Sequence, residues 1–498
     1  MMKVLLIDPP HAIFKYFRGR MPFPGLVALA AYLEKDFEVK VCDATVLDYP
    51  WEDMEGIIRE YRPEVVGIGS NSTSFSYDAT NTAYLVKKVD PKIITVGGGA
   101  HFSALPEESL KECPSLDYIV IGEGEVTMHE LLTNLESKGD LQKVNGLAFR
   151  EGGQIVKTPQ RPLLSDIDKL PMPAYHLYPM DRYFMPSLGM DPHRSIILTT
   201  ARGCEGKCTF CSEGALWRNT WRPRSAKLVV DEMELLYRKY GKVSFMFGDN
   251  VFNGTRQRLL DFAEELEQRK LPIHFWFQTR TDAILRDADL LPRLKKLGLY
   301  MLSMGVETPS QQILDSYNKK QTPEISRKAM EAIRKNGLLF IANVMWGDWE
   351  DTEETLKETL RFARPYTHHF AIQLTTPLPG TEYARRAEAE GRIQVRDYSK
   401  YDMLNPIMPT RTLSLDRVGY LHPRAIQRFY SRPRVFWDAF FSPNRFLRRN
   451  NRFFLKLAWE TITRQTWEQK NYKPFEVYMS EKLGKPFAPV HGPRARKA

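Results

Sequence analysis

The first third of the chain alternates short apolar runs with segments whose apolar residues recur at helical spacing. The apolar runs lie at residues 3–7, 38–43, 65–69, 93–99 and 118–122, and the helical segments at 25–35, 54–61 and 126–137. Strands that are apolar on both faces and separated by helices are typical of a parallel, doubly wound sheet. Such sheets bind their ligands beyond the carboxyl ends of the strands.

A second alternating series follows between residues 195 and 374. The expected strands are 195–200, 243–247, 274–278, 300–304, 339–345 and 369–374, with helices at 227–239, 257–268 and 324–336. Six strand–helix repeats predict a partial (β/α)6 barrel. Its site would again lie at the carboxyl ends of the strands.

These patterns predict an α/β protein with four segments. They are a doubly wound domain at 1–140, a linker with a hairpin at 141–189, the partial barrel at 190–410, and a helical, basic, aromatic-rich C-terminal region at 411–498. The hairpin is expected over 146–156 because two β-forming runs flank Gly152-Gly153. In the C-terminal region helical patterns cover 420–430, 434–441 and 446–467.

The composition is that of a soluble globular protein of about three domains. The chain has 498 residues, of which 43% are hydrophobic and 27% are charged. No apolar run reaches the ~18 residues of a membrane-spanning helix, and the short run after Met1 is typical of a strand rather than a signal peptide. Because the chain also has only five cysteines, we expect it in a reducing cytoplasm.

Much of the net charge of +10 falls after about residue 385, and basic and aromatic residues interleave at 428–434 and 437–441. Such a region could bind nucleic acid, an anionic membrane surface or an acidic substrate, or form a solvated face. Nucleic acid is disfavoured because no nucleic-acid-binding module accompanies the charge. The aromatic residues leave three alternatives open: core packing, a lid over a bulky apolar substrate, and peripheral membrane contact.

Three of the five cysteines, Cys204, Cys208 and Cys211, form the run C-x3-C-x2-C directly after an expected strand. Three thiolates can hold three irons of a cubane cluster, whereas ordinary electron-transfer clusters use four. The fourth iron would then be open to a small molecule. A zinc site would need a further ligand nearby, and Cys42 and Cys113 are too distant in the sequence to supply it. Three close cysteines also cannot all pair in disulfides.

With Phe210 before the third cysteine, this motif resembles the radical S-adenosylmethionine (SAM) superfamily. The resemblance implies a 4Fe–4S cluster whose open iron chelates SAM. It also implies reductive cleavage of SAM to a 5′-deoxyadenosyl radical, with an external electron donor such as flavodoxin or ferredoxin. The family's SAM-contact positions match Phe210, Gly248, Asp249, Asn250, Arg280, Gly305, Glu307 and Trp346.

Two of these positions have a specific expected role. Arg280 could pair with the methionine carboxylate of SAM, although a buried salt bridge is an equally open alternative. Glu307 could accept hydrogen bonds from the ribose hydroxyls, as acidic residues do in dinucleotide sites.

The stretch 374–381 resembles a radical SAM subset with an N-terminal corrinoid domain, and the N-terminal sheet resembles that cobalamin-binding domain. The implied cobalamin contacts are Ser70, Asn71, Ser72, Thr73, Gly98, Gly99, His101, Gly122, Glu123, Gly124 and Glu125. The D-x-H-x-x-G motif that supplies a cobalt-binding histidine is absent: Asp8-Pro9-Pro10-His11 is one residue too long and lacks the glycine. His11 and His101 could still approach the cofactor. A doubly wound module without cofactor remains the alternative.

The favoured hypothesis is a cobalamin-dependent radical SAM enzyme that methylates an unactivated carbon of a small-molecule or lipid-like substrate. The alternative is an oxidative cyclisation or rearrangement without methyl transfer, because the string at 428–433 resembles the group of the anaerobic magnesium-protoporphyrin ester cyclase. A third hypothesis is a non-catalytic corrinoid- or nucleic-acid-binding regulator that uses the basic tail.

Overall fold

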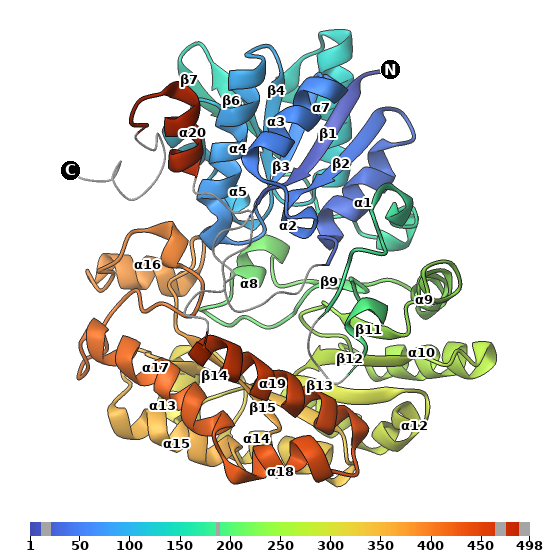
Figure 1. Cartoon of the computed structure of the whole chain (residues 1–498), viewed down its shortest axis with the longest axis vertical. Helices are drawn as coiled ribbons and strands as arrows, with labels where there is room; N and C mark the ends of the chain where they lie inside the picture. The colour runs from blue at the N-terminus through green and yellow to red at the C-terminus, as the bar shows by residue number, and fades with distance from the viewer. Residues whose placement is uncertain (11–20, 186–189, 464–474, 488–498) are drawn as a thin grey trace. The chain divides into compact units, whose positions relative to one another are not determined.

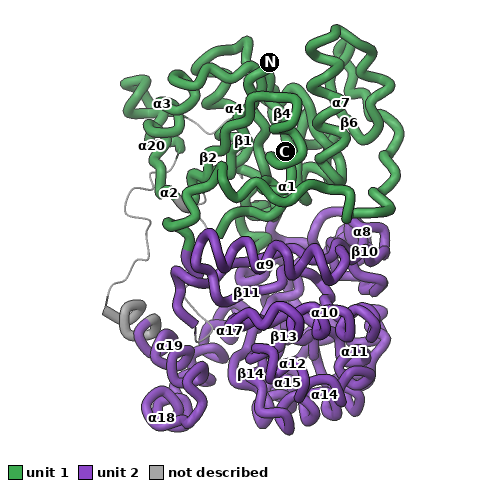
Figure 2. Tube along the Cα trace, turned by 90° about the vertical axis from the view of Figure 1, so that its right-hand side faces the viewer, with its two compact units in different colours: residues 1–183, 396–402, 466–498 green, residues 184–395, 403–465 purple. Residues whose placement is uncertain are grey.

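The computed structural model describes residues 1–10, 21–185, 190–463 and 475–487. The chain divides into two compact units (Figure 2). Unit 1 comprises Met1–Tyr183, Arg396–Asp402 and Thr466–Ala498, and unit 2 comprises Phe184–Val395 and Met403–Gln465. Each unit is built on its own sheet (Figure 1).

Unit 1 contains a seven-stranded sheet in the order β2-β1-β3-β4-β5-β6-β7. The parallel strands are β1 (Lys3–Asp8), β2 (Glu38–Asp43), β3 (Val65–Gly69), β4 (Ile94–Gly98) and β5 (Tyr118–Val120). They confirm the predicted parallel sheet. The expected hairpin also forms, as β6 (Leu147–Glu151) and β7 (Gln154–Lys157). Since β6 pairs antiparallel with β5, this hairpin extends the sheet instead of lying in a linker.

Alternate residues of β1 enter two different cores. Leu5 packs with α3 (Trp51–Tyr61) and α4 (Ser76–Val89), while Leu6 packs with α1 (Pro24–Leu33) and α7 (Gly124–Ser137). Side chains of a strand point alternately to the two faces of its sheet, so covering both faces requires a continuous apolar run. This is the physical basis of the apolar patterns in the first third of the sequence.

Two segments from far along the chain belong to unit 1. Helix α20 (Phe475–Leu483) places Phe475 against Trp51, with 4.7 Å between ring centroids. Tyr398, in the loop after the barrel, lies 5.1 Å from the ring of His101. The sequence pattern places α20 in the C-terminal region and Tyr398 in the barrel segment. The sequence around neither residue indicates that it packs against a residue hundreds of positions earlier in the chain.

Unit 2 contains six parallel strands in the order β15-β14-β13-β12-β11-β8. They are β8 (Ser195–Leu198), β11 (Ser244–Phe247), β12 (His274–Thr279), β13 (Leu299–Glu307), β14 (Leu339–Trp346) and β15 (His369–Leu374). These strands confirm the predicted partial barrel. The helices predicted between them also form, as α9 (Ala226–Tyr240), α10 (Arg256–Arg269) and α14 (Pro323–Lys335).

The described part of the C-terminal region is helical, as predicted. It forms α17 (Leu415–Tyr430), α18 (Pro433–Phe441) and α19 (Arg445–Thr463). Phe446 of α19 lies 4.8 Å from the ring of Tyr300 and 5.2 Å from that of His274, at the starts of β13 and β12. This helix therefore covers the amino ends of barrel strands. Among the described residues, none of the helices is both long and apolar enough to cross a bilayer.

Candidate active site

The three-cysteine motif occupies a loop that enters from a short ribbon of two strands. The strand β9 (Ala201–Gly203) pairs antiparallel with β10 (Trp221–Pro223), and Cys204 follows it. The loop is anchored further along by Thr209, whose backbone N–H donates to the carbonyl of Tyr317 at 3.0 Å and whose hydroxyl donates to that of Ser316 at 3.1 Å. This ribbon was not predicted, because three-residue strands carry too little pattern.

Between two of the thiols, Gly206 leaves the space that a side chain would fill. A Cβ at this position would lie 3.2 Å from the Cys204 sulfur, 3.8 Å from the Cys208 sulfur and 2.6 Å from Nη1 of Arg280. The Gly206 N–H also points at the Cys204 sulfur, at 3.3 Å. A glycine therefore keeps both sulfurs accessible and allows Arg280 to approach them.

The surroundings of two of the thiols disfavour free thiolates. Burial raises the pKa of Cys211 to about 12, with Glu213 adding to the effect, and burial also raises the pKa of Cys208. Binding to a metal is the way in which such thiols lose their protons. No three His, Cys, Asp or Glu side chains in the described part of the chain converge to hold one metal ion. A cluster in which each of three irons takes one thiolate does not need that convergence, so the motif fits a cubane better than zinc.

Phe210 orients the end of the loop by packing. Its ring lies 4.9 Å from that of Tyr317 at a near-perpendicular angle. It also borders a buried cluster that includes Tyr383 and Met408. The aromatic residue before the third cysteine thus fixes the backbone next to Cys211.

At the end of β11, Asp249 fastens the strand that leads into the cysteine loop. One carboxylate oxygen accepts the N–H groups of Thr200 and Ala201 at 2.6 and 2.9 Å, and the other accepts the Thr200 hydroxyl. Burial raises the pKa of Asp249 to about 6, although Arg258 and these donors act to lower it. The neighbouring Asn250 donates to Glu213 at 2.8 Å. The contacts of Asp249 are therefore those of a residue that positions the loop, and Gly248 is the turn residue before it.

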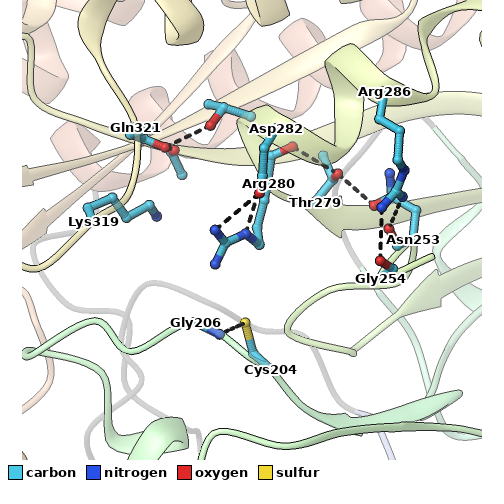
Figure 3. A network of polar contacts seen from close by, with 12 residues as sticks. Cys204, Gly206, Asn253, Gly254, Thr279, Arg280, Asp282, Arg286, Lys319 and Gln321 are labelled. Atoms are coloured by element: carbon cyan, nitrogen blue, oxygen red, sulfur yellow. Dashed lines mark hydrogen bonds and ion pairs between the residues drawn. The ribbon is translucent and has the colours of Figure 1, made fainter. Parts of the chain in front are cut away.

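Arg280 follows β12, and Figure 3 shows its guanidinium pointing into the space beside Cys204. The side chain is held by Asp282, with contacts of 3.1 and 3.3 Å. Burial acts against its charge, yet Asp282 and the Cys204 sulfur outweigh it and raise the pKa of Arg280. The predicted cation is therefore present at the thiols. Its salt bridge is partly open, so a carboxylate ligand can compete for it.

Glu307, the last residue of β13, forms an ion pair that the sequence did not reveal. The Lys319 ammonium donates to Oε1 of Glu307 at 2.6 Å, and both side chains are nearly buried. Burial acts to lower the pKa of Lys319, but Glu307 and the Cys208 sulfur outweigh it and raise the pKa. A Cβ at Gly305 would lie 2.2 Å from that oxygen. A side chain at position 305 would therefore displace the ends of this pair.

Lys319 is the main residue of this site that sequence reasoning missed. It lies between Asn318 and the exposed Lys320, a context typical of a surface turn. In Figure 3 its ammonium points toward Arg280. Two cations therefore face the cysteine loop, although only one was predicted.

Trp346 ends β14 and is 3% exposed, and its indole N–H has no hydrogen-bond partner within the described structure. A buried donor without a partner is costly, so it points to a ligand acceptor. The turn that follows is held by Asp351, which accepts the N–H groups of Gly347 and Asp348 at 2.9 and 3.0 Å. These hydrogen bonds hold the backbone at the end of β14, and the Trp346 indole N–H remains available to a ligand.

In unit 1 the predicted cobalamin residues gather at the carboxyl ends of β3 and β4. The backbone N–H of Ser70 donates to the Gly98 carbonyl at 2.9 Å, and Thr73 lies 3.4 Å from Nδ1 of His101. Ser72 contacts Ser74 through their hydroxyls at 3.0 Å. Asn71 in the same turn is exposed. His11 lies outside the described residues.

The glycines at these ends differ in what surrounds them. Among the described residues, a Cβ at Gly98 or Gly122 would meet nothing within 4 Å, whereas one at Gly99 would lie 2.4 Å from the Ser70 carbonyl oxygen. Gly99 also has φ of +99°, so its position demands glycine for the turn itself. Open space for a ligand therefore lies over Gly98 and Gly122. Glu123 is buried and accepts the Leu164 N–H at 2.7 Å.

The remaining predicted residues begin helix α7. Gly124 is its first residue and Glu125 is buried in its first turn. A helix start presents free N–H groups to a ligand at this edge of the sheet.

Two family models match the chain. The B12 binding domain model matches residues 10–132, and the Radical SAM superfamily model matches residues 198–363. The first match includes the ends of β3, β4 and β5, and the second includes the cysteine loop, Arg280, Glu307 and Trp346.

Relatives of similar length are found by sequence. An uncharacterized methyltransferase of Pyrococcus horikoshii is 30% identical over 449 residues, which cover 90% of this chain and 96% of that protein. The anaerobic magnesium-protoporphyrin IX monomethyl ester cyclase of Rubrivivax gelatinosus is 33% identical over 429 residues, covering 84% and 76%.

A solved structure has the same fold. It is the cobalamin-dependent S-adenosylmethionine radical enzyme OxsB with aqua-cobalamin and S-adenosylmethionine bound, which matches with a TM-score of 0.70 at 18% identity. The match covers 97% of this chain and 75% of that chain.

Proposed function

This chain belongs to the radical SAM enzymes that carry a B12-binding domain, and from that premise we propose that it methylates an unactivated carbon of a bulky, largely apolar small molecule. The family resemblance of the cysteine motif is thereby confirmed. The enzyme's cofactors are a 4Fe–4S cluster, SAM and cobalamin. When bound, the cluster supplies the electron that cleaves SAM, and cobalamin supplies a carrier for a methyl group.

The observation that carries the proposal is the convergence of three thiols and two cations at adjacent strand ends. In this proposal Cys204, Cys208 and Cys211 each hold one iron. Arg280 and Lys319 offset the negative charge of the thiolates, since like charges at one site oppose each other and opposite charges favour ionisation. A small external donor of the flavodoxin or ferredoxin class delivers the electron.

The same strand ends supply the SAM contacts that we propose. Arg280 pairs with the methionine carboxylate, because its salt bridge to Asp282 is partly exposed and exchangeable. Lys319 fixes one oxygen of Glu307, which leaves the other oxygen to accept from the ribose hydroxyls. The unpartnered Trp346 indole N–H donates to an acceptor of the adenosyl group.

For cobalamin we propose a site formed mainly by backbone. The open space above Gly98 and Gly122 lets a flat or extended ligand approach the ends of β4 and β5. The hydroxyl groups of Ser72 and Thr73 supply hydrogen bonds along the adjacent turn. His101 lies beside them, with Tyr398 packed against its ring.

Methyl transfer is supported by the Pyrococcus horikoshii methyltransferase, which this chain matches over 96% of that protein. Cyclisation without methyl transfer is the second candidate, and the 33% identity to the Rubrivivax gelatinosus cyclase favours it. Both candidates use the same thiols and cations. They differ in whether the SAM methyl group reaches the product.

The deciding experiment follows the methyl group. The chain is reconstituted anaerobically with iron, sulfide and cobalamin, then reduced with methyl-labelled SAM present. It is offered an organic-solvent extract of its host cells or magnesium-protoporphyrin monomethyl ester. We expect 5′-deoxyadenosine together with label in an extractable product. An unlabelled, cyclised porphyrin would instead establish the second candidate, and turnover without label in any product would overturn the methylation proposal.

A further inference from the structure

Helix α18 turns its largest side chains outward. Phe436, Trp437, Phe440 and Phe441 are 59%, 63%, 48% and 64% exposed, whereas Val435 and Ala439 are buried. Positions 436, 437, 440 and 441 share one face of a helix. This is the reverse of the usual arrangement in a soluble protein, in which aromatic side chains fill the core.

The four aromatic residues form one surface, here called the aromatic patch. Ring centroids lie 5.5 Å apart for Phe436 and Phe440, 4.4 Å for Trp437 and Phe441, and 6.4 Å for Phe440 and Phe441. Contiguous exposed apolar surface of this kind marks interaction sites.

Helix α19 places positive charge beside the aromatic patch. Arg445, Arg449, Arg452 and Lys456 are all exposed at spacings of four, three and four residues, which places them along one helix face. We call them the basic stripe. Arg452 donates to the Ala439 carbonyl at 2.8 Å, and its guanidinium lies 5.7 Å from the ring of Phe440. Figure 1 shows the two helices side by side.

Acidic residues are rare in the stretch of sequence that carries the aromatic patch and the basic stripe. Between residues 430 and 456 the sequence has seven arginines and lysines and one carboxylate, Asp438. That carboxylate is paired with Arg434 at 3.5 Å. The surface is therefore suited to a partner that is both negatively charged and apolar just beneath its charges.

We propose that α18 and α19 dock this chain on an anionic lipid bilayer. The aromatic patch inserts at the level of the headgroups, where Trp and Phe are favoured, and the basic stripe lies against the lipid phosphates. A nucleic acid would satisfy the charge but would leave the exposed aromatic face without an apolar medium. An acidic protein remains an outcome that the test distinguishes.

The docking surface and the cysteine loop lie at opposite ends of the barrel strands. Phe446 of α19 packs at the start of β13, whereas Cys204 follows the strand that continues from the carboxyl end of β8. Docking would therefore hold the enzyme at a membrane without covering its thiols. The inference does not depend on which reaction the thiols support.

The test is sedimentation of the full chain with phosphatidylcholine vesicles that either contain or lack phosphatidylserine. We expect binding only to the anionic vesicles and loss of binding at high salt. Phe436→Ser with Trp437→Ser should weaken vesicle binding at least about tenfold, and Arg449→Glu with Lys456→Glu should weaken it similarly. Lys143→Glu with Lys169→Glu, at exposed sites of unit 1, is the control with the same change of charge.

A second measurement separates insertion from misfolding. Vesicles that carry brominated lipid should quench the tryptophan fluorescence of the bound protein, and Trp437→Phe should sediment normally but lose part of that quenching. Equal binding to both vesicle types, or equal loss in the Lys143/Lys169 control, would overturn the proposal. So would a lipid-free dimer, detected by analytical ultracentrifugation, that the Phe436/Trp437 variant dissociates.

Discussion

At the carboxyl ends of the barrel strands, charged side chains crowd around the thiols, whereas the ends of β3 and β4 offer mainly glycines and hydroxyl groups. Lys319 and Glu307 form a nearly buried pair in unit 2, while Gly98 in unit 1 has only open space above it. The ends of the barrel strands, here called the charged edge, therefore depend on side-chain charge. The ends of β3 and β4, where we propose that cobalamin binds, depend instead on the shape of the backbone. Substitutions at the charged edge should therefore impair SAM cleavage, whereas substitutions at the ends of β3 and β4 should impair cobalamin binding.

The largest effect is expected at the thiols. Cys208→Ala removes one of three cluster ligands and should reduce 5′-deoxyadenosine formation to background, because a cluster with one fewer ligand is not retained. Iron content and anaerobic SAM cleavage are the measurements. Cys113→Ala, at a buried thiol of unit 1, is the control and should keep both. Cobalamin binding should survive in both variants if the two edges are separable.

The next largest effect is expected at the buried ion pair. Lys319→Met leaves Glu307 without its partner, and breaking a buried pair costs about 3 kcal/mol or more. This cost lowers the free energy of unfolding, and because Glu307 is the proposed ribose contact, we also expect kcat/KM for SAM cleavage to fall. The adjacent exposed Lys320→Met should change little, and Lys319→Arg should restore part of the loss. An unchanged Lys319→Met enzyme would show that charge at this edge is dispensable.

A larger side chain at the end of β4 should affect only the proposed cobalamin site. Gly98→Leu fills the open space at the end of β4 and should weaken cobalamin binding by about tenfold or more, while the iron content stays normal. Gly56→Leu is the matched control, because a Cβ there also meets nothing within 4 Å but lies on α3. Cobalamin titration followed by absorbance measures both. Equal affinities in the two variants would contradict a backbone-built site.

The smallest effect on the cofactor sites concerns pH, which acts through the stability of the charged edge. Burial raises the pKa of Asp351 to about 7, with Asp348 adding to it and the Thr355 hydroxyl acting against it. Between about pH 4 and pH 7 the folded state thus binds a proton that the unfolded state lacks. Stability should fall as pH rises through this window, by up to about 1.4 kcal/mol per pH unit.

Asp351→Asn should flatten that slope in urea unfolding curves measured from pH 4 to 7. Asp53→Asn, at an exposed position of α3, should leave the slope as it is in the wild type. Parallel slopes for the wild type and Asp351→Asn would show that the Asp351 carboxyl does not titrate in this window.

The sequence predicted the elements that repeat a local pattern. Inner strands such as 65–69 and 339–345 are apolar runs because both of their faces are buried. The three cysteines were found by their C-x3-C-x2-C spacing, and Arg280 was found because it follows such a strand directly. Lys319 was not found, since its local sequence resembles that of its exposed neighbour Lys320. It pairs with Glu307, which adjoins a register shift in the β13–β14 pairing, and neither feature leaves a pattern in the sequence.

Long-range assembly was also beyond sequence reasoning. Tyr398 reaches His101, and Phe475 reaches Trp51, across hundreds of residues. Nothing in the local spacing identifies such partners, because aromatic residues pack into any available core. Asp249 shows the opposite case: its position was predicted, yet its contacts to Thr200 and Ala201 assign it to holding the loop.

The return of α20 to unit 1 has a consequence for the order of events on the ribosome. Phe475, Tyr478 and Met479 complete a core whose other members are made hundreds of residues earlier. Synthesis proceeds from the amino end, and domains ordinarily fold as they emerge. The core of the domain that emerges first therefore closes only after residues 475–479 have been made. Corrinoid loading should accordingly follow the synthesis of α20.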